Sequence, residues 1–192
     1  GAGSAFAPSP PLAGIAEAAD LARRVVAYDP RADAGVIERA GRLAAHILDE
    51  ITPHVVPGVT TAELDAIIYR LMREGGAVPA TLGYRGYTHS SCISINHVVC
   101  HGIPSPQQTL KKGDIVNIDV AVEKDGWYGD TSRMFVVGDG SIAAKRLCAF
   151  TYEAMWKGIA KVRPGARLGD LGAAIGAIAP TSLLAHIEVT IA

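Results

Sequence analysis

Two stretches of the chain carry apolar residues at helical spacing. Apolar side chains recur every three or four positions from Gly35 to Ile51 and again from Thr61 to Glu74, which places them on one face of a helix. Thr60 or Thr61 is a suitable N-cap for the second helix, with Glu63 in its first turn. We expect both helices to act as structural supports that face the core.

Further along the chain the pattern changes to period two, which is typical of β-strands. The alternation from Ser91 to Cys100 predicts one strand, ended by the segment His101-Gly102-Ile103-Pro104. A second alternating segment, Ile115 to Val122, leads to the turn residues Asp125-Gly126, and Trp127 to Val137 runs back. Asp-Gly between two such segments predicts a β-hairpin with a two-residue turn. Together with the helices, this indicates an α+β fold.

Two more helices are predicted, from Ser141 to Val162 and from Leu168 to Ile178. The segment that joins them, residues 162–166, resembles residues 56–60, because each contains Pro-Gly, follows a helix and introduces another. We therefore expect the chain to begin a second copy of its helix-helix-strand unit here, and to stop before the strands of that copy.

The predicted hairpin places two aspartates relative to each other. With Asp125-Gly126 as the turn, Ala121 faces Asp130 and Asp119 faces Ser132. Asp119 and Asp130 are then diagonal neighbours on one face, with Cβ atoms roughly 7 Å apart. Aspartates near a turn are usually solvated, but these two lie in mid-strand among apolar residues, where an unpaired charge is costly. Two interpretations remain open: a solvated pair, or a site for one or two metal ions.

His101 and its neighbours are the second candidate for chemistry. A histidine at a strand end beside glycine and proline is either a satisfied polar residue or a functional one. Cys100 is interpreted as a small buried residue rather than a nucleophile, because the sequence indicates no acid-base partner for it. His97 has a spacing compatible with metal binding, but we expect it to lie on the surface.

Composition limits the class of protein. The chain has 192 residues, of which 49% are hydrophobic and 19% charged, with a formal net charge of -1, so nothing indicates a nucleic-acid-binding tail or a basic membrane face. No apolar run reaches the length that spans a bilayer. The three cysteines lack CxxC spacing, which favours a reducing, cytoplasmic location over a disulfide framework or a zinc ribbon.

The first residues differ in composition from the rest. Residues 1–34 open with a tail rich in Pro, Ala, Ser and Gly, for which we expect a flexible N-terminal extension with one short helix at 16–26. There is no positively charged segment followed by an apolar one, so no secretory signal is predicted. The remainder, 35–192, is expected to form one domain.

In their order along the chain, several segments resemble the methionine aminopeptidases, metallo-exopeptidases of the pita-bread fold. The resemblance covers about residues 35–178. The matching segments are Leu82-Gly83-Tyr84, Gly86-Tyr87, Ser91 to Asn96, Cys100 to Pro104, Gly113 to Val120, Asp125-Gly126, Gly129 to Ser132, and Val162 to Leu168. No single motif justifies the name, whereas the combination of His-Gly-Ile-Pro with the two spaced aspartates is highly specific.

The resemblance implies a role for each matching residue. Asp119 would be the bidentate ligand of one divalent metal ion (Co, Mn, Fe or Zn), and Asp130 would bridge two. His101 would contact the substrate and stabilise the reacting centre, as the catalytic histidine. Tyr84, Tyr87, Cys92 and Thr81 would surround the methionine side chain, whose thioether suits aromatic and sulfur surfaces. The implied reaction removes the initiator methionine from nascent polypeptides, with the ribosome as a possible place of action.

Some positions depart from the family pattern. Thr88-His89 stands where the family usually has Pro-Lys, and His97 where it commonly has Glu. The resemblance also implies three further metal ligands, a histidine in a His-Gly-Ile-Gly context and two glutamates on later strands, and no matching segment follows Ile178. His186 and Glu188 lack that context, so we do not take them as substitutes.

Three hypotheses follow from this incomplete match. The first is a C-terminally incomplete methionine aminopeptidase whose activity as this shortened chain is in doubt. The second is a non-catalytic relative that binds peptides or regulates. The third is another peptidase of the same fold, such as a proline-directed one. The Cys100 to Pro104 segment and the tyrosine pair favour methionine.

Overall fold

The structure is a computed structural model that describes residues 34–178. The predicted extension at 1–34 therefore lies outside the described residues except for Ala34, as do the predicted helix at 16–26, His186 and Glu188. The elements in chain order are α2 (Ala34–Ile51), η1 (Thr52–His54), α3 (Thr61–Glu74), β1 (Val78–Pro79), η2 (Tyr84–Gly86), β2 (Cys92–Ile95), β3 (Ile115–Lys124), β4 (Trp127–Val136), α4 (Ile142–Ile159) and α5 (Leu168–Gly176). No helix in this part of the chain is long and apolar enough to cross a membrane.

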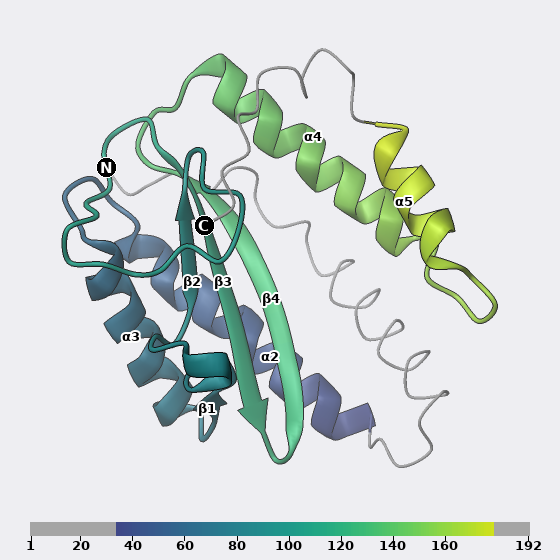
Figure 1. Cartoon of the computed structure of the whole chain (residues 1–192), viewed down its shortest axis with the longest axis horizontal. Coiled ribbons are helices and arrows are strands. Elements are labelled where there is room, and N and C mark those ends of the chain that lie inside the picture. Colours follow the sequence, from purple (N-terminus) through teal and green to yellow (C-terminus); the bar gives the residue numbers. More distant parts are fainter. Residues whose placement is uncertain (1–33, 179–192) are drawn as a thin grey trace.

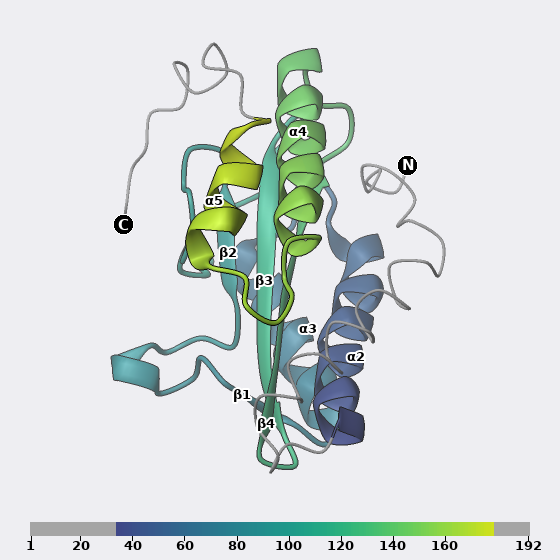
Figure 2. The same cartoon turned by 90° about the vertical axis from the view of Figure 1, so that its right-hand side faces the viewer.

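The centre of the fold is an antiparallel sheet built around β3 (Figure 1). β4 pairs with the whole of β3, from Ile115 to Lys124. Since a strand has only two edges, β1 and β2 must share the other one, β1 at Glu123 and Val122 and β2 at residues 116–119. Helices α2 and α3 lie on one side of this sheet (Figure 2).

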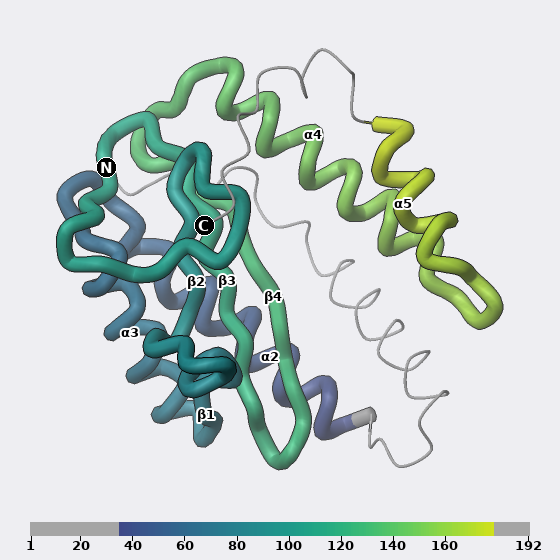
Figure 3. Tube along the Cα trace, in the orientation of Figure 1, coloured from purple at the N-terminus to yellow at the C-terminus, as the bar shows by residue number. Residues whose placement is uncertain are grey.

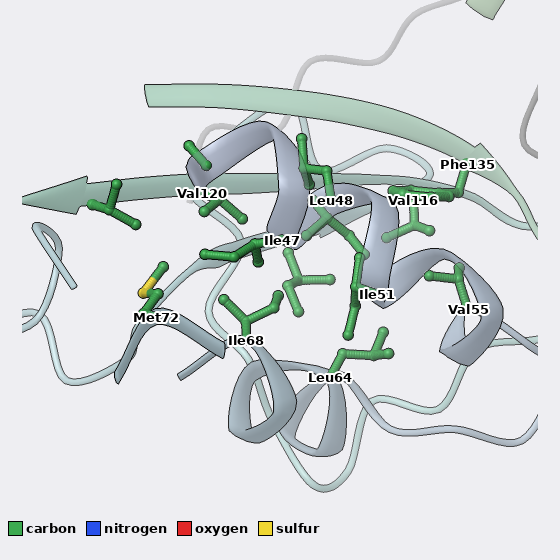
Figure 4. Packing of buried hydrophobic residues seen from close by; sticks show 14 of the residues in the cluster. Ile47, Leu48, Ile51, Val55, Leu64, Ile68, Met72, Val116, Val120 and Phe135 are labelled. Atoms are coloured by element: carbon green, nitrogen blue, oxygen red, sulfur yellow. The ribbon is translucent and has the colours of Figure 1, made fainter. Parts of the chain in front are cut away.

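The core lies between the sheet and these two helices. Alternate residues of β3, beginning at Val116, are fully buried, whereas the residues between them are only half-buried. The buried side chains pack against Ile47 and Leu48 of α2 and Ile68 and Met72 of α3 (Figure 4). The two helices are thus the core-facing supports that their apolar spacing predicts. The other face of the sheet is left for polar residues.

The predicted helix starts agree with the structure. Thr60 is the N-cap of α3, where its hydroxyl accepts from the Glu63 N–H at 3.2 Å and the Glu63 carboxylate accepts from the Thr60 N–H at 2.8 Å. This reciprocal arrangement satisfies two backbone donors that the helix itself leaves free. Ser141 caps α4 in a similar way through its hydroxyl.

The predicted repeat is present as a second helix pair. α2 and α4 each contain 18 residues, and the glycine in each following turn, Gly58 and Gly165, has positive φ. At the start of α5 the Asp170 carboxylate accepts from the Arg167 N–H at 2.9 Å, as Glu63 does in α3. α4 packs chiefly against α5 rather than on the sheet (Figure 1). Within residues 34–178 this second pair has no strands of its own.

Two local predictions on the segment after β2 are wrong. The strand predicted from Ser91 to Cys100 ends at Ile95, because Asn96 takes positive φ (52°). After β2 the chain continues as a loop (Figure 3). The Asn96 side chain holds this turn by donating to the Asp114 carboxylate at 2.9 Å and accepting from the Ile115 N–H at 3.1 Å. Cys100, predicted to be buried, is exposed as a result. His97 is exposed, as predicted.

Arg133 links β4 to the end of α2 and provides a test of this packing. Its guanidinium donates to the Leu48 carbonyl at 3.1 Å and to the Asp49 carboxylate at 2.8 Å. We expect Arg133→Ala to lower the free energy of unfolding by about 1–2 kcal/mol in urea titrations, because the partly buried Leu48 carbonyl loses its charged donor. Asp49→Ala removes only the exposed ion pair and should cost less than about 0.5 kcal/mol. Equal losses would contradict this account.

Candidate metal and substrate site

The two aspartates of the hairpin lie as the sequence predicts. Asp125 and Gly126 both have positive φ (54° and 81°), as the two central residues of a type I′ turn require. The register pairs Asp119 with Ser132 and Ala121 with Asp130, so the predicted register is confirmed. Asp119 and Asp130 are therefore diagonal neighbours on the sheet face opposite α2 and α3. The residues that alternate with Asp119 along β3 point to the other face, into the core.

The environment of the Asp119 carboxyl group favours its protonated form. Burial raises the pKa of Asp119 to about 6, and the negative charge of Asp130 and a hydrogen bond between the two carboxyl groups act in the same direction. His101 and the Val120 N–H oppose this rise in the pKa of Asp119. A pair of carboxylates that repel each other is stabilised by a proton or a cation between them.

β2 brings a sulfur atom beside this pair. Cys92 is the cross-strand partner of Asp119, and such partners project from the same face of a sheet. Its side chain is buried, and burial, with smaller contributions from the Asp119 and Asp65 carboxylates, raises the pKa of the Cys92 thiol. A thiol with a raised pKa is a poor nucleophile at neutral pH, so Cys92 is suited to contact rather than chemistry.

Tyr87 adjoins Cys92. Its hydroxyl donates to the Ser91 carbonyl at 2.9 Å. Burial, a hydrogen bond with Cys92 and the nearby Asp65 and Asp119 carboxylates together raise the pKa of Tyr87 above its ordinary value. The ring is thus held next to Cys92 and remains neutral.

His101 reaches the site through a close approach of its neighbour to β2. The Gly102 carbonyl accepts from the Ile93 N–H at 2.8 Å, and the Gly102 N–H donates to the Ser94 hydroxyl at 3.0 Å. A Cβ at position 102 would lie 2.2 Å from the Ile93 oxygen, so this pairing requires glycine. His101 has positive φ (57°) and is exposed, near enough to Asp119 to lower the pKa of that carboxyl.

Tyr84 and Thr81 are placed differently from the other predicted contacts. Tyr84 is 65% exposed, and its ring lies beneath the Arg85 guanidinium, 5.6 Å from it. It belongs to η2, on the loop that projects from the sheet (Figure 2). The Thr81 hydroxyl donates to the His89 carbonyl at 3.0 Å. The structure therefore gathers Tyr87, Cys92, His101 and Asp119, whereas Tyr84 lies outside this group.

Asp65 of α3 is a buried residue that the sequence reasoning overlooked. It is 8% exposed, and its carboxylate accepts from the Ser91 hydroxyl at 2.7 Å and from the Ser90 N–H at 3.1 Å. A signal for it was available, because Thr61, Leu64, Asp65, Ile68 and Met72 follow helical spacing and form the buried face of α3.

The residues at the aspartate pair match a divalent ion in chemistry but not in number. Carboxylate oxygens suit Mg, Ca and Mn, and they also serve Zn. Among residues 34–178 there is no group of three or more His, Cys, Asp or Glu side chains able to hold a metal ion. Asp119 and Asp130 would therefore need ligands from water or from elsewhere in the protein.

The fold with its aspartate pair is that of a metallopeptidase of the pita-bread class. The profile of Metallopeptidase family M24 matches residues 35–185, so the chain belongs to this family. Among curated proteins it is similar to the methionine aminopeptidase of Rickettsia prowazekii, with 60% identity over 136 residues that cover 71% of this chain and 52% of that protein. The methionine aminopeptidase of Escherichia coli strain K12 is 56% identical over 137 residues, with the same coverage.

Solved structures give the same assignment. The crystal structure of methionine aminopeptidase from Rickettsia prowazekii matches with a TM-score of 0.71 and 58% identity, covering 72% of this chain and 56% of that one. The prolidase of Pyrococcus furiosus, with a TM-score of 0.66 and 22% identity, shares the fold alone. These matches confirm the α+β, partial pita-bread fold. The chain spans about half the length of the curated relatives it matches.

Proposed function

We propose that the protein removes the initiator methionine from the N-terminus of new polypeptides by metal-dependent hydrolysis of the first peptide bond, and that Asp119 and Asp130 are two of its metal ligands. The observation that carries the proposal is the diagonal pair Asp119 and Asp130, next to His101. Its support is the identity of 60% to a methionine aminopeptidase. The likeness to prolidases, at 22% identity, does not favour a proline-directed activity.

Each residue has a proposed role in that reaction. Asp119 and Asp130 would hold divalent metal ions, which supply Lewis-acid polarisation of the scissile carbonyl when bound. His101 would donate a hydrogen bond to the substrate, or accept one from it, at the reacting peptide bond. Tyr87 and Cys92 would contact the methionine side chain, and Thr81 and the exposed Tyr84 would be its further contacts.

The finer features of this function are also proposals. We infer two divalent ions, chosen from Co, Mn, Fe and Zn by their availability in the cell, because carboxylate sites accept several of them. The expected place of action is the cytoplasm, where polypeptides emerge from the ribosome. The composition, with a net charge of -1, supports neither nucleic-acid nor membrane binding.

A second candidate function rests on a specific observation. Residues 34–178 contain no group of three or more His, Cys, Asp or Glu side chains able to hold a metal ion, so the second candidate is a chain that retains the peptide-binding face without turnover. In that case it would be a non-catalytic peptide-binding or regulatory relative. Metal binding and peptide hydrolysis separate the two functions.

The test uses the 192-residue chain, Mn²⁺ or Co²⁺, and the peptide Met-Gly-Met. We expect Asp130→Ala to weaken metal binding by at least about tenfold in calorimetric titrations, since half of the carboxylate pair is lost, and to reduce methionine release at least as much. Asp125→Asn is a matched control on the same hairpin, because asparagine tolerates the positive φ of the turn.

The outcomes distinguish the proposals. Methionine release that Asp130→Ala abolishes supports the peptidase function. Metal and peptide binding without release supports the non-catalytic alternative. Release that is unaffected by Asp130→Ala would overturn the assignment of the site.

A further inference from the structure

We propose that Asp65 is a positioning residue that fixes the methionine-contacting side of the site, Tyr87 and Cys92, relative to the metal-binding aspartates. Asp65 belongs to α3, which lies on the side of the sheet opposite to the face that carries the metal-binding aspartates. It touches none of the proposed metal ligands or reacting groups. The inference rests on the proposed function for the meaning of the site, but its main test does not require catalysis.

The first step is the bond between Asp65 and the segment that precedes β2. The carboxylate accepts from the Ser91 hydroxyl at 2.7 Å and from the Ser90 N–H at 3.1 Å and 3.4 Å. All three residues are buried: Asp65 is 8% exposed, Ser90 4% and Ser91 0%. A buried carboxylate is stable only when such donors surround it, and its bonds are stronger than those between neutral groups. Asp65 therefore pins this segment to α3.

The second step carries this restraint to the site. The Ser91 carbonyl accepts from the Tyr87 hydroxyl at 2.9 Å. Cys92, the next residue, begins β2 opposite Asp119. The position of Ser91 thus determines where the Tyr87 hydroxyl is held and where the Cys92 sulfur lies relative to the aspartate pair.

The third step reaches His101. The Tyr87 hydroxyl also lies 3.5 Å from the Gly102 carbonyl, and the same carbonyl accepts from the Ile93 N–H. One buried carboxylate thereby connects α3, through Ser91 and Tyr87, to the segment that carries His101. A connected network of buried hydrogen bonds can stabilise the arrangement of a site by more than the sum of its separate bonds.

The loop between β1 and β2 explains why such an anchor is needed. Residues 80–91 contain one short 3-10 helix, η2, in which Arg85 has positive φ (48°), and several residues of this loop are exposed. Exposed loops with few buried contacts open locally at low free-energy cost. Ser90 and Ser91, where this loop rejoins the sheet, are buried and are held by their bonds to Asp65.

The test measures the accessibility of the Cys92 thiol. In the 192-residue chain with Cys100→Ser and Cys148→Ser, Cys92 is the only cysteine, and its labelling by a disulfide reagent reports opening of the loop. We expect Asp65→Ala to increase the labelling rate about tenfold or more, because buried donors lose their acceptor. Asp65→Asn keeps the shape and one acceptor oxygen, and should restore most of the protection.

Thr61→Val is the matched control. Thr61 lies one turn earlier on α3, is 0% exposed, and its hydroxyl oxygen accepts from the Ser105 N–H at 2.8 Å. This variant loses a buried bond from the same helix to a different loop, so it should leave the labelling of Cys92 within about twofold of the parent. Equal rates for Asp65→Ala and Thr61→Val would overturn the proposal.

A second measurement covers the case in which Asp65→Ala does not fold. Ser91→Ala removes only the hydroxyl partner and leaves the Asp65 carboxylate in place, so it should increase labelling of Cys92 about threefold. A labelling rate that Ser91→Ala leaves unchanged would overturn the proposal.

Kinetics connect the anchor to the proposed function. If the chain releases methionine, Asp65→Ala should raise KM for Met-Gly-Met about threefold or more with little change in kcat, as expected for a loss of side-chain positioning, and Asp65→Asn should raise it less. A change confined to kcat would contradict this role. If the chain releases no methionine, the proposed function fails for this polypeptide, and the labelling experiment still decides the role of Asp65.

Discussion

Replacing Gly129 by alanine is expected to remove the native packing of the hairpin. A Cβ at this position of β4 would lie 2.3 Å from both the carbonyl carbon and the oxygen of Ala40, and 2.7 Å from the Gly41 nitrogen. All three are backbone atoms of α2, which cannot move aside as a flexible side chain can. Overpacking of a close-packed core costs about 1–3 kcal/mol and occasionally more, and we expect Gly129→Ala to lie at or above the upper end of this range.

The measurement is equilibrium unfolding in urea, followed by circular dichroism. Gly41→Ala is a control on the other side of the same contact: its Cβ would meet no atom within 4 Å, and alanine is favoured over glycine in a helix by about 0.5–1 kcal/mol. The two substitutions should therefore have opposite signs. A Gly129→Ala variant with the stability of the parent would show that α2 does not approach β4 as described.

Because Gly129 precedes Asp130, this contact also matters for the site. The contact at Gly129 sets how closely β4 packs on α2. Arg133 holds the same strand to α2 through its bond to the Leu48 carbonyl. Both residues act from the face opposite to the aspartates. We therefore expect Gly129→Ala to impair metal binding even under conditions in which the protein remains folded.

The hairpin was predictable because its information is local. The Asp125-Gly126 turn specifies the loop length, and the loop length fixes which residues face each other. From there the diagonal placement of Asp119 and Asp130 follows from the period of a strand. The distances between their carboxyl groups and His101 were not predictable, since they depend on the pairing of Gly102 with β2.

The end of β2 was not predictable, because it is set by contacts between distant segments. The alternation of residues 91–100 is compatible with a long strand, but Asn96 turns the chain with its side chain bonded to Asp114 and Ile115. These partners lie 18 and 19 positions away in the sequence. The wrong prediction that Cys100 is buried follows from the same missing information.

Asp65 shows a different limit of sequence reasoning. The apolar residues at helical spacing in α3 include Leu64, Ile67, Ile68 and Leu71, whereas the buried face is rotated toward Thr61 and Asp65. Apolar periodicity gives the direction of a helix face only from its apolar members. Helical spacing places Asp65 beside the apolar face of α3, but its burial depends on its partners, Ser90 and Ser91, which the spacing does not reveal.

In the absence of metal, replacing Asp119 by asparagine is expected to stabilise the protein at neutral and alkaline pH. The pKa of Asp119 is raised from its ordinary value of 3.8 to about 6, so between these values the folded protein binds a proton that the unfolded chain has released. Stability from this group is therefore fully present below pH 3.8 and is lost as the pH rises through about 6. A shift of about two pH units corresponds to about 3 kcal/mol, which partial exposure reduces to about 1–3 kcal/mol.

The sign of the effect distinguishes a binding site from a structural ion pair. Asp119→Asn should raise the free energy of unfolding by this amount at pH 8 and hardly at all at pH 4, whereas Glu123→Gln on the same strand should change it by less than about 0.5 kcal/mol at both. Added Mn²⁺ should stabilise the parent at pH 8, because a ligand that binds only the folded state shifts the equilibrium toward it, and should not stabilise Asp119→Asn. If the substitution destabilised the metal-free protein at pH 8, Asp119 would serve the fold rather than the metal. If Asp119→Asn stabilises the metal-free protein as expected, the burial of Asp119 and its repulsion from Asp130 are a cost that the fold retains because a cation relieves it.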